Sequence, residues 1–222
     1  MTEPTDPQAD RSLPADPVQE RAGHLGYVAH EIRNPMSTAL WTAELLTRLG
    51  PADRGGARGE KLSTLCLRSL ARVRLLVEDH LLCERLDAGG YPSRIEPVAV
   101  GEALSVVLGR SPAEGVPVEV AVGVELTALA DRTLLERALE GLVAMAARDA
   151  AAVRVEGSRR DGRVAILVTG GPPAPLEDPH KGAPSEQRGR ALALPMARRV
   201  AAALGGALTV EGQGYLLSIP AA

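Results

Sequence analysis

The sequence predicts an α+β protein in which a helical hairpin (residues 19–88) precedes a domain built from a mixed sheet and helices (residues 97–222). Two observations carry this prediction. Apolar residues recur at steps of three and four through the first region, which is the period of an amphipathic helix. The second region contains short segments rich in Val, Leu and Ile that are typical of strands, interrupted by helical segments.

The N-terminal region begins with a tail and continues as two long helices. Residues 1–18 combine prolines with acidic residues, and we expect them to be disordered. Helices are expected at about 19–49 and 60–87, joined by the Gly-rich loop 50–59, and Pro35 should bend the first helix. Such a hairpin cannot cover its own apolar stripe. We therefore expect two copies to pair into a four-helix bundle, which makes the protein a homodimer.

The second region follows a turn-rich linker at residues 89–96. Its long segment 171–190, rich in Gly, Pro and charge, is typical of a functional or mobile loop. Strands are expected at 97–100, 116–122, 124–130, 207–212 and 214–220, with a hairpin at 151–170 that turns at Arg160, Asp161 and Gly162. Helices are expected at 131–150, with Asp131 as N-cap, and at 191–204, ended by Gly205 and Gly206.

The composition fits a globular protein and excludes several functional classes. Of the 222 residues 45% are hydrophobic, and 25 Lys and Arg are balanced by 28 Asp and Glu, which argues against a dedicated nucleic-acid binder. No stretch approaches the roughly 18 apolar residues of a membrane span, and the acidic N-terminus is unlike a secretory signal. Cys66 and Cys83 lack metal-ligand spacing. We therefore expect a cytoplasmic protein with no metal site and no nucleic-acid or membrane partner.

Chemistry-bearing side chains gather around His30 on the first helix. Val28 and Ile32 flank it on the apolar side, so we expect the imidazole to point outward as an accessible nucleophile. Glu31 is a candidate acceptor for the Nδ1–H group, which would leave Nε2 free to attack phosphorus. Asn34 lies one turn further on, where its amide can position a water molecule or a phosphoryl oxygen.

The segment HEIRNP (30–35) resembles the phosphoacceptor box of the two-component sensor histidine kinases. The end of the second helix with its linker (81–100) resembles the corresponding segment of that family, and 131–150 resembles the helix of its asparagine box. Residues 191–220 resemble its second glycine box and final strands. The resemblance runs from about 20 to 220 in family order. It implies a dimerisation and phosphotransfer hairpin followed by an α/β-sandwich ATPase-type domain.

The residues that bind nucleotide in the family are replaced in this chain. Gly141 and Met145 stand at the two asparagine positions, Thr169 at the adenine-binding aspartate, Pro173 at a glycine of the same box, and Ala191 and Ala193 at glycines of the second glycine box. A hydrogen bond to a charged group contributes about 1.5–3 kcal/mol. Losing about three such contacts costs about 5–8 kcal/mol, or roughly 10⁴-fold in affinity. We therefore expect no ATP cofactor, unless Glu177, Asp178 or Lys181 supply other ligands.

An intact phosphoacceptor box beside a degenerate ATP site resembles a histidine phosphotransferase of a bacterial phosphorelay. This resemblance implies that His30 exchanges a phosphoryl group with the aspartate of a response-regulator receiver domain, or accepts it from an upstream hybrid histidine kinase. The receiver domain would supply Mg²⁺. It would dock over a surface formed by Arg33, Ser37, Thr38 and Trp41. Asn34 suggests that the same surface could also dephosphorylate the regulator.

Two alternatives stay open on the sequence alone. The first is an ATP-dependent sensor histidine kinase with a divergent nucleotide pocket. The second is a non-catalytic pseudokinase that dimerises with, or sequesters, signalling partners. Labelling with ATP and magnesium separates the first alternative from the phosphotransferase, and a His30→Ala variant that keeps its activity in the cell would favour the second.

Overall fold

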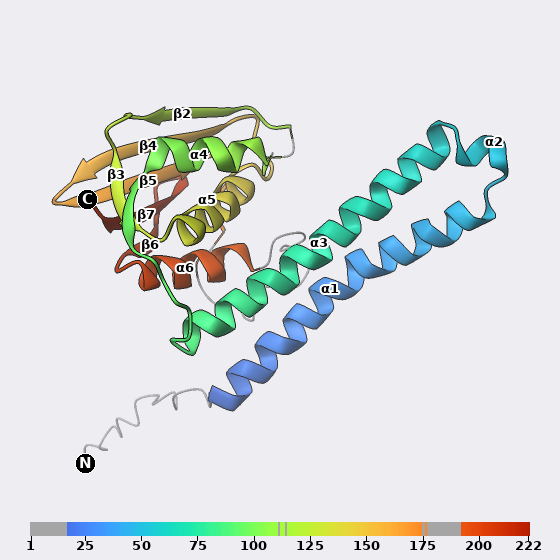
Figure 1. The fold of residues 1–222 in the computed structure, drawn as a ribbon, viewed down its shortest axis with the longest axis horizontal. Coiled ribbons are helices and arrows are strands. Elements are labelled where there is room, and N and C mark those ends of the chain that lie inside the picture. The colour runs from blue at the N-terminus through green and yellow to red at the C-terminus, as the bar shows by residue number, and fades with distance from the viewer. Residues whose placement is uncertain (1–16, 111, 114, 175, 177–191) are drawn as a thin grey trace, which may run out of the picture.

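The computed structural model describes residues 17–110, 112–113, 115–174, 176 and 192–222. Figure 1 shows a long helical hairpin with a second domain packed against its side. Most of the predicted 1–18 tail and of the 171–190 loop lies outside the described residues. The α+β class predicted from the sequence is confirmed, with the helical hairpin first and the sheet domain second.

The hairpin consists of α1 (Pro17–Arg48), the short α2 (Pro51–Arg54) and α3 (Ala57–Asp87). The helix α2 lies within the segment predicted as a loop. Its Arg54 guanidinium donates hydrogen bonds to the backbone carbonyls of Thr47 at 3.2 Å and Leu49 at 3.1 Å. Since the last carbonyls of a helix have no partner within it, Arg54 caps the end of α1. This contact fixes the connection between the two long helices.

The second domain contains the remaining elements. In chain order they are β1 (Glu96–Ala99), α4 (Val100–Gly109), β2 (Val118–Val122), β3 (Thr127–Ala130), α5 (Arg132–Ala146), β4 (Val153–Arg160), β5 (Arg163–Thr169), α6 (Ala193–Ala203), β6 (Ala207–Glu211) and β7 (Gly214–Pro220). The main sheet has the order β2-β4-β5-β7-β6, and β1 pairs with β3 apart from it. The pair β2–β4 is parallel and the other neighbours are antiparallel, which confirms the predicted mixed sheet.

Helix α4 was not predicted, and the strand expected at 97–100 ends at its start. Val100, Ala103, Leu104 and Val107 are all buried on one side of α4. Their spacing is helical, but the many β-branched residues favour a strand locally. Packing of this apolar face therefore decides the conformation. The next helix also differs from the prediction, because α5 ends at Ala146 rather than at residue 150.

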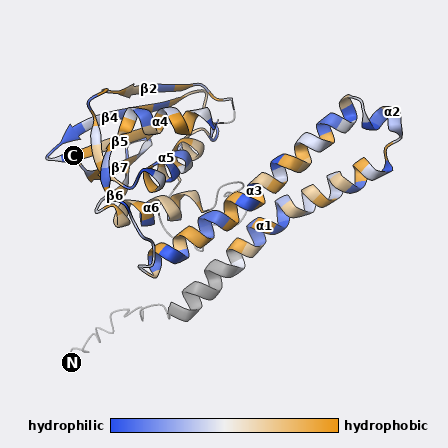
Figure 2. Ribbon diagram, in the orientation of Figure 1, coloured by the Kyte–Doolittle hydropathy of each residue, from blue (hydrophilic) through white to orange (hydrophobic). Residues whose placement is uncertain are grey.

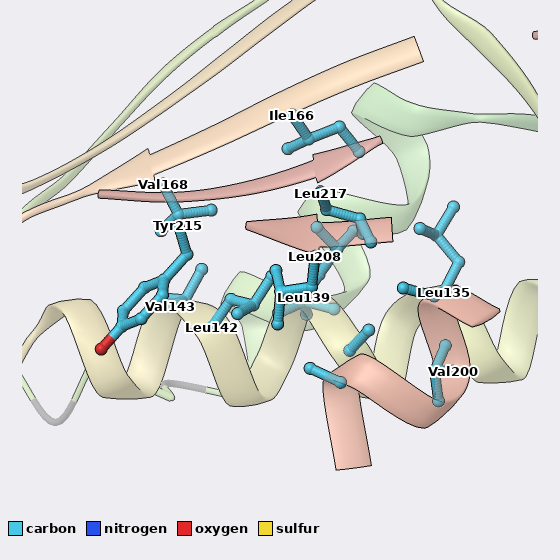
Figure 3. Close-up of a cluster of buried hydrophobic side chains, with 14 of the residues drawn as sticks. Leu135, Leu139, Leu142, Val143, Ile166, Val168, Val200, Leu208, Tyr215 and Leu217 are labelled. Atoms are coloured by element: carbon cyan, nitrogen blue, oxygen red, sulfur yellow. The ribbon is translucent and has the colours of Figure 1, made fainter. Parts of the chain in front are cut away.

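The core of the second domain lies between the sheet and α5, and Figure 3 shows its centre. Leu135, Leu139 and Leu142 follow one another at helical spacing on α5 and are fully buried. They meet sheet residues that include Ile166 on β5 and Leu217 on β7. Burying a side chain of this size contributes about 1.5–3 kcal/mol. The apolar core of the domain is thus complete, although this chain has other residues at the positions that bind nucleotide in the family that it resembles.

The predicted capping and turn residues are confirmed. The Asp131 side chain accepts a hydrogen bond from the backbone N–H of Leu134 at 3.1 Å, and it also accepts one from the N–H of Arg94 at 2.9 Å. A single carboxylate therefore starts α5 and ties the linker to it. Asp161 and Gly162, with φ of 50° and 73°, form the turn between β4 and β5.

Apolar side chains remain exposed along the hairpin. Figure 2 shows that apolar and polar residues alternate along both long helices. Among the exposed large apolar residues are Met36, Leu40 and Trp41 on α1 and Leu67, Leu70, Val77 and Leu81 on α3. Such a surface is what the predicted pairing of two hairpins would cover. Within the described residues, no helix combines the length and the apolar character that a membrane crossing requires.

Candidate functional site

The imidazole of His30 is exposed on α1, as the helical pattern predicted. Val28 is only 5% exposed, Pro35 is buried and Ile32 is half-buried, so the apolar side of this turn faces inward. The helix α1 continues through Pro35 without interruption. A partner can therefore approach the ring of His30 from solvent, which a phosphoacceptor requires.

The carboxylate of Glu31 lies on a different side of α1 from His30. Its side chain is buried, at 8% exposure, while His30 is exposed. Consecutive residues of a helix point roughly 100° apart and do not face each other. The direct hydrogen bond from His30 Nδ1 to Glu31, suggested by the sequence, is therefore unfavourable in this helix, and the role of Glu31 stays a prediction.

Three polar or aromatic residues share the exposed face of His30. Asn34, Ser37 and Trp41 follow it at helical spacing and are all exposed, Trp41 by 57%. Arg33 is exposed at the margin of this face. Thr38, at the opposite margin, is half-buried, and its hydroxyl donates to the backbone carbonyl of Asn34 at 3.1 Å. We call the surface formed by His30, Arg33, Asn34, Ser37, Thr38 and Trp41 the histidine face.

The two asparagine positions of the family lie on a buried, apolar part of α5. A Cβ atom added to Gly141 would lie 3.4 Å from Cβ of Ala193 and 3.5 Å from Cε of Met196, both on α6. Met145, one turn further along α5, is only 7% exposed. The start of α6 therefore packs directly on this part of α5. Neither side chain offers an oxygen ligand to a cation or a hydrogen-bond donor to a phosphate.

The segment after β5, where the family binds adenine, is tied to its surroundings by its backbone. The N–H of Gly171 donates to the carbonyl of Ala146 at 2.7 Å, and the N–H of Ala174 donates to the hydroxyl of Tyr215 at 2.8 Å. Thr169, at the end of β5, is half-buried and donates to the carbonyl of Arg154 at 3.4 Å, and Pro173 is also half-buried.

Tyr215 is a buried residue of this region that the sequence reasoning did not single out. Burial raises the pKa of its hydroxyl, while the hydrogen bond from the backbone of Ala174 lowers it. The hydroxyl therefore serves as a neutral partner for the segment after β5. Since one aromatic residue in a strand carries no special signal, only the fold identifies this contact.

The structure describes only some of the other positions that the sequence analysis considered as nucleotide ligands. Ala193 is buried at the start of α6, in contact with the position of Gly141. Ala191, Glu177, Asp178 and Lys181 lie outside the described residues. In the described part of the chain, no group of three or more His, Cys, Asp or Glu side chains is placed to hold a metal ion.

A small recess beside Gly141 lies between the hairpin and the second domain. Its lining includes Leu76 and Asp79 on α3, Arg137 on α5 and Met196 on α6. Nε of Arg137 donates to Oδ1 of Asp79 at 2.8 Å. Burial raises the pKa of Asp79 to about 6, although the Arg137 guanidinium opposes this shift. The sequence analysis missed this pair, because the two residues lie far apart in the chain.

Comparison with known proteins places the histidine face in a defined domain. Residues 20–89 match the model of the His Kinase A (phospho-acceptor) domain. The chain is 34% identical over 210 residues to the sensor protein CseC of Streptomyces coelicolor, covering 87% of this chain and 37% of that protein. It is 33% identical over 121 residues to CseC of Streptomyces avermitilis, covering 54% of this chain and 22% of the relative. The chain thus spans well under half of these relatives.

Solved structures share the overall fold. Acinetobacter baumannii histidine kinase AdeS matches with a TM-score of 0.63 and 17% identity, over 86% of this chain and 97% of that one. Full-length ShkA in complex with AMPPNP matches with a TM-score of 0.57 and 27% identity, over 94% of this chain and 46% of that one. Histidine kinase ThkA in complex with the response regulator TrrA matches with a TM-score of 0.60 and 16% identity, over 92% of this chain and 63% of that one.

Proposed function

Because the chain belongs to the two-component sensor histidine kinase family, we propose that His30 is its phosphoacceptor and exchanges a phosphoryl group with the aspartate of a response-regulator receiver domain. The exposure of His30 within the matched phosphoacceptor domain is the observation that carries this proposal. The exposed Asn34, Ser37 and Trp41 leave room on the same face of α1 for a docked partner.

The transfer is an in-line displacement at phosphorus. Nε2 of His30 attacks the aspartyl phosphate as a nitrogen–phosphorus bond forms, and the bond from phosphorus to the carboxylate oxygen breaks. The receiver domain supplies the Mg²⁺ that neutralises the developing charge. In the reverse direction the carboxylate is the nucleophile and the imidazole leaves. In this proposal the exposed Asn34, one turn from His30, holds a water molecule for hydrolysis, which would give the same face a phosphatase activity.

The composition of α5 supports a protein donor rather than ATP. Gly141 provides no side chain and Met145 provides a thioether, which is a poor ligand for a hard cation. Both positions are buried, and position 141 packs on Ala193 and Met196 of α6. Opening this contact to admit phosphates would expose the apolar surface of α5 and α6 without gaining new polar partners. We therefore propose a receiver domain or an upstream hybrid histidine kinase as the donor.

An ATP-dependent sensor histidine kinase is the second candidate, and the comparisons favour it over a protein that only transfers phosphoryl groups. Both curated relatives are named sensor proteins. The ShkA structure, 27% identical to this chain, contains AMPPNP. In this candidate the ligands of the nucleotide come from residues outside the described part of the chain, such as Glu177, Asp178 or Lys181. The two candidates share His30 and differ only in the donor.

The proposed working unit is a homodimer that binds receiver domains. Pairing two hairpins into a four-helix bundle would cover the exposed apolar side chains of α1 and α3. A receiver would then dock on the histidine face, over Arg33, Ser37, Thr38 and Trp41. The ThkA structure contains a response regulator, and its likeness to this chain supports the fold that such docking requires.

Labelling of the full chain with two donors decides between the candidates. One sample receives labelled ATP with magnesium, and another receives receiver domains that carry labelled phosphate. We expect His30 to be labelled by a receiver and not by ATP, with His30→Ala as the blank. Robust labelling by ATP that is lost in His30→Ala would establish the second candidate. If neither donor labels His30, the result would favour a non-catalytic pseudokinase.

A further inference from the structure

Strand β2 forms one edge of the main sheet and is the least covered of its strands. In the order β2-β4-β5-β7-β6 it pairs with β4 on one side only, and Figure 1 shows it at the upper border of the sheet. Among the strands that the structure describes, β2 is the one without a buried residue. This edge of the sheet therefore presents both backbone and side chains to a partner.

Three valines of β2 share the face of the sheet that carries the core. Val118 and Val122 are half-buried and pack against the core of the domain. Val120 lies between them on the same face, because side chains alternate along a strand. It is nevertheless 44% exposed. Since β-branched apolar side chains favour a pleated surface with neighbours on both sides, the middle of β2 lacks one neighbour.

The backbone of the same three valines faces the open edge. In the parallel pair of β2 with β4, the N–H of Val153 donates to the carbonyl of Pro117 at 2.8 Å. The groups that face a neighbouring strand belong to alternate residues, so those of Glu119 and Ala121 also point toward β4. The N–H and C=O groups of the three valines therefore point away from β4 and are available for a further strand.

We propose that β2 pairs in antiparallel orientation with β2 of a second copy of this chain, about a two-fold axis at Val120. In this register Val118 lies opposite Val122 of the second copy, and Val120 lies opposite its own counterpart. The outward-facing backbone groups then bond to one another. On the other face of the sheet Glu119 lies opposite Ala121, so no like charges meet. The two sheets join into one, and the exposed valines cover each other.

The opposite edge of the sheet is less suited to this pairing. The residues of β6 on the core face are Leu208, which is 8% exposed, and Val210, which is 43% exposed. A second copy on β6 would thus cover one exposed side chain next to one that is already buried. Sheets protect their edges with prolines, bulges or inward-pointing charges. Residues 118–122 contain no proline, pair with β4 without a bulge and carry no charge on the core face.

The size of this contact makes the pairing reversible. Stable interfaces use about 20–30 residues on each side, whereas β2 has five residues. The association therefore depends on the concentration of the chain, and it would gather several histidine faces where copies are concentrated. The pairing uses none of the exposed residues of α1 and α3, so it is separable from the proposed pairing of hairpins. It also does not depend on which donor supplies the phosphoryl group.

Opposite charges at position 120 test the pairing and its axis together. Sedimentation equilibrium of the full chain over a wide range of concentrations measures the association of each protein. We expect Val120→Lys and Val120→Glu each to associate about tenfold more weakly than the wild type, because a valine pair is lost and like charges meet across the axis. An equimolar mixture of the two variants should recover to within about threefold of the wild type, because opposite charges then meet.

The matched controls are Val210→Lys and Val210→Glu, which place the same charges at a valine of similar exposure on the other edge strand. They should associate as the wild type does, alone and mixed. Thermal unfolding of every variant checks that the fold is retained, as is expected for exposed positions. A wild type that associates no more strongly than Val120→Lys, or a mixture that associates no more strongly than its two components, would overturn the proposal.

Amide hydrogen exchange provides an independent measurement of the register. At high protein concentration the amides of Val118, Val120 and Val122 should exchange more slowly than at low concentration. Those of Glu119 and Ala121 should not change, because they already face β4. The concentration dependence should disappear in Val120→Lys. Equal slowing at all five amides, or none at the three valines, would contradict pairing through this edge.

Discussion

Gly141 on α5 packs against Ala193 on α6 so closely that a Cβ atom at position 141 would lie 3.4 Å from that of Ala193. This separation is ordinary van der Waals contact. There is thus room for a methyl group, while a longer side chain would press on the side chains of Ala193 and Met196 and on the backbone carbonyl of Ala193. Substitutions at position 141 therefore test both the packing of α5 on α6 and the proposal that nucleotide does not bind there.

Two substitutions at position 141 should have opposite effects on the free energy of unfolding. Gly141→Ala should stabilise the protein by about 0.5–1 kcal/mol, because Gly within a helix is unfavourable relative to Ala. Gly141→Asn should destabilise it by about 1–3 kcal/mol, because the longer side chain overfills the contact with Ala193 and Met196. Urea denaturation of both variants measures the difference. If Asn were as stable as Ala, this part of α5 would have room and partners for polar groups, as a nucleotide site requires.

Stability should depend on pH through Asp79. Its pKa of about 6 in the folded protein lies above the ordinary value of 3.8, so the folded state binds this proton more tightly than the unfolded state. The contribution is therefore complete below about pH 4 and is lost as pH rises through 6, by up to about 3 kcal/mol. The charged groups acting on Asp79 are Arg137, which lowers its pKa, and Glu78 and Glu140, which raise it.

Asp79→Asn provides the matched control for this pH dependence, because its side chain stays neutral. The wild-type unfolding free energy should fall relative to that of the variant between about pH 4 and pH 7. Denaturation curves of both proteins at each pH give the difference and cancel the titration of all other groups. A difference that stays constant, or that favours the wild type increasingly as pH rises, would contradict the assignment.

The hydroxyl of Tyr215 should contribute to holding the segment after β5. Tyr215→Phe removes the acceptor of the Ala174 N–H group at little change in volume, and we expect a loss of about 1–2 kcal/mol. Hydrogen exchange at Ala174 should accelerate more than the change in global stability explains. Tyr91→Phe, at a half-buried position in the linker, is the control. Unchanged exchange at Ala174 would show that another group satisfies this amide.

Substitution of Asn34 should separate the proposed phosphatase activity from phosphotransfer to His30. Asn34 is exposed one turn from His30, so Asn34→Ala should leave the fold and the labelling of His30 within about twofold of the wild type. The rate at which the chain dephosphorylates a bound receiver should fall about 10²-fold, because positioning of water is lost. Time courses of labelled receiver with each variant measure both rates. An equal loss of transfer and hydrolysis would assign Asn34 to receiver docking instead.

The sequence predicted the features that depend on local periodicity and turn chemistry. The exposure of His30 follows from the helical spacing of Val28 and Ile32, and the start of α5 follows from Asp131 as its cap. No element was expected over residues 101–109, where α4 lies, because ten residues are too few to show a clear helical period. The end of α5 was placed too late, since Ala is compatible with both a helix and its end.

Sequence patterns did not predict contacts between segments that lie far apart in the chain. Asp79 and Arg137 each look like a solvated charge on a helix surface, and only the docking of α5 on α3 brings them together. The same holds for the contact of Gly141 with Ala193. The replacement of ligand residues was visible in the sequence, but the apolar packing that accompanies it required the fold.

Transfer of labelled phosphate to His30 tests the central claim most directly. The full chain is incubated with labelled donor, ATP with magnesium in one arm and phosphorylated receiver domains in the other, and the label on the chain is followed in wild type, His30→Gln and His80→Gln. In the receiver arm we expect an acid-labile, base-stable label in the wild type and in His80→Gln, and none in His30→Gln, whereas the ATP arm should label none of the three proteins. Label that persists in His30→Gln would contradict the assignment of His30 as the phosphoacceptor.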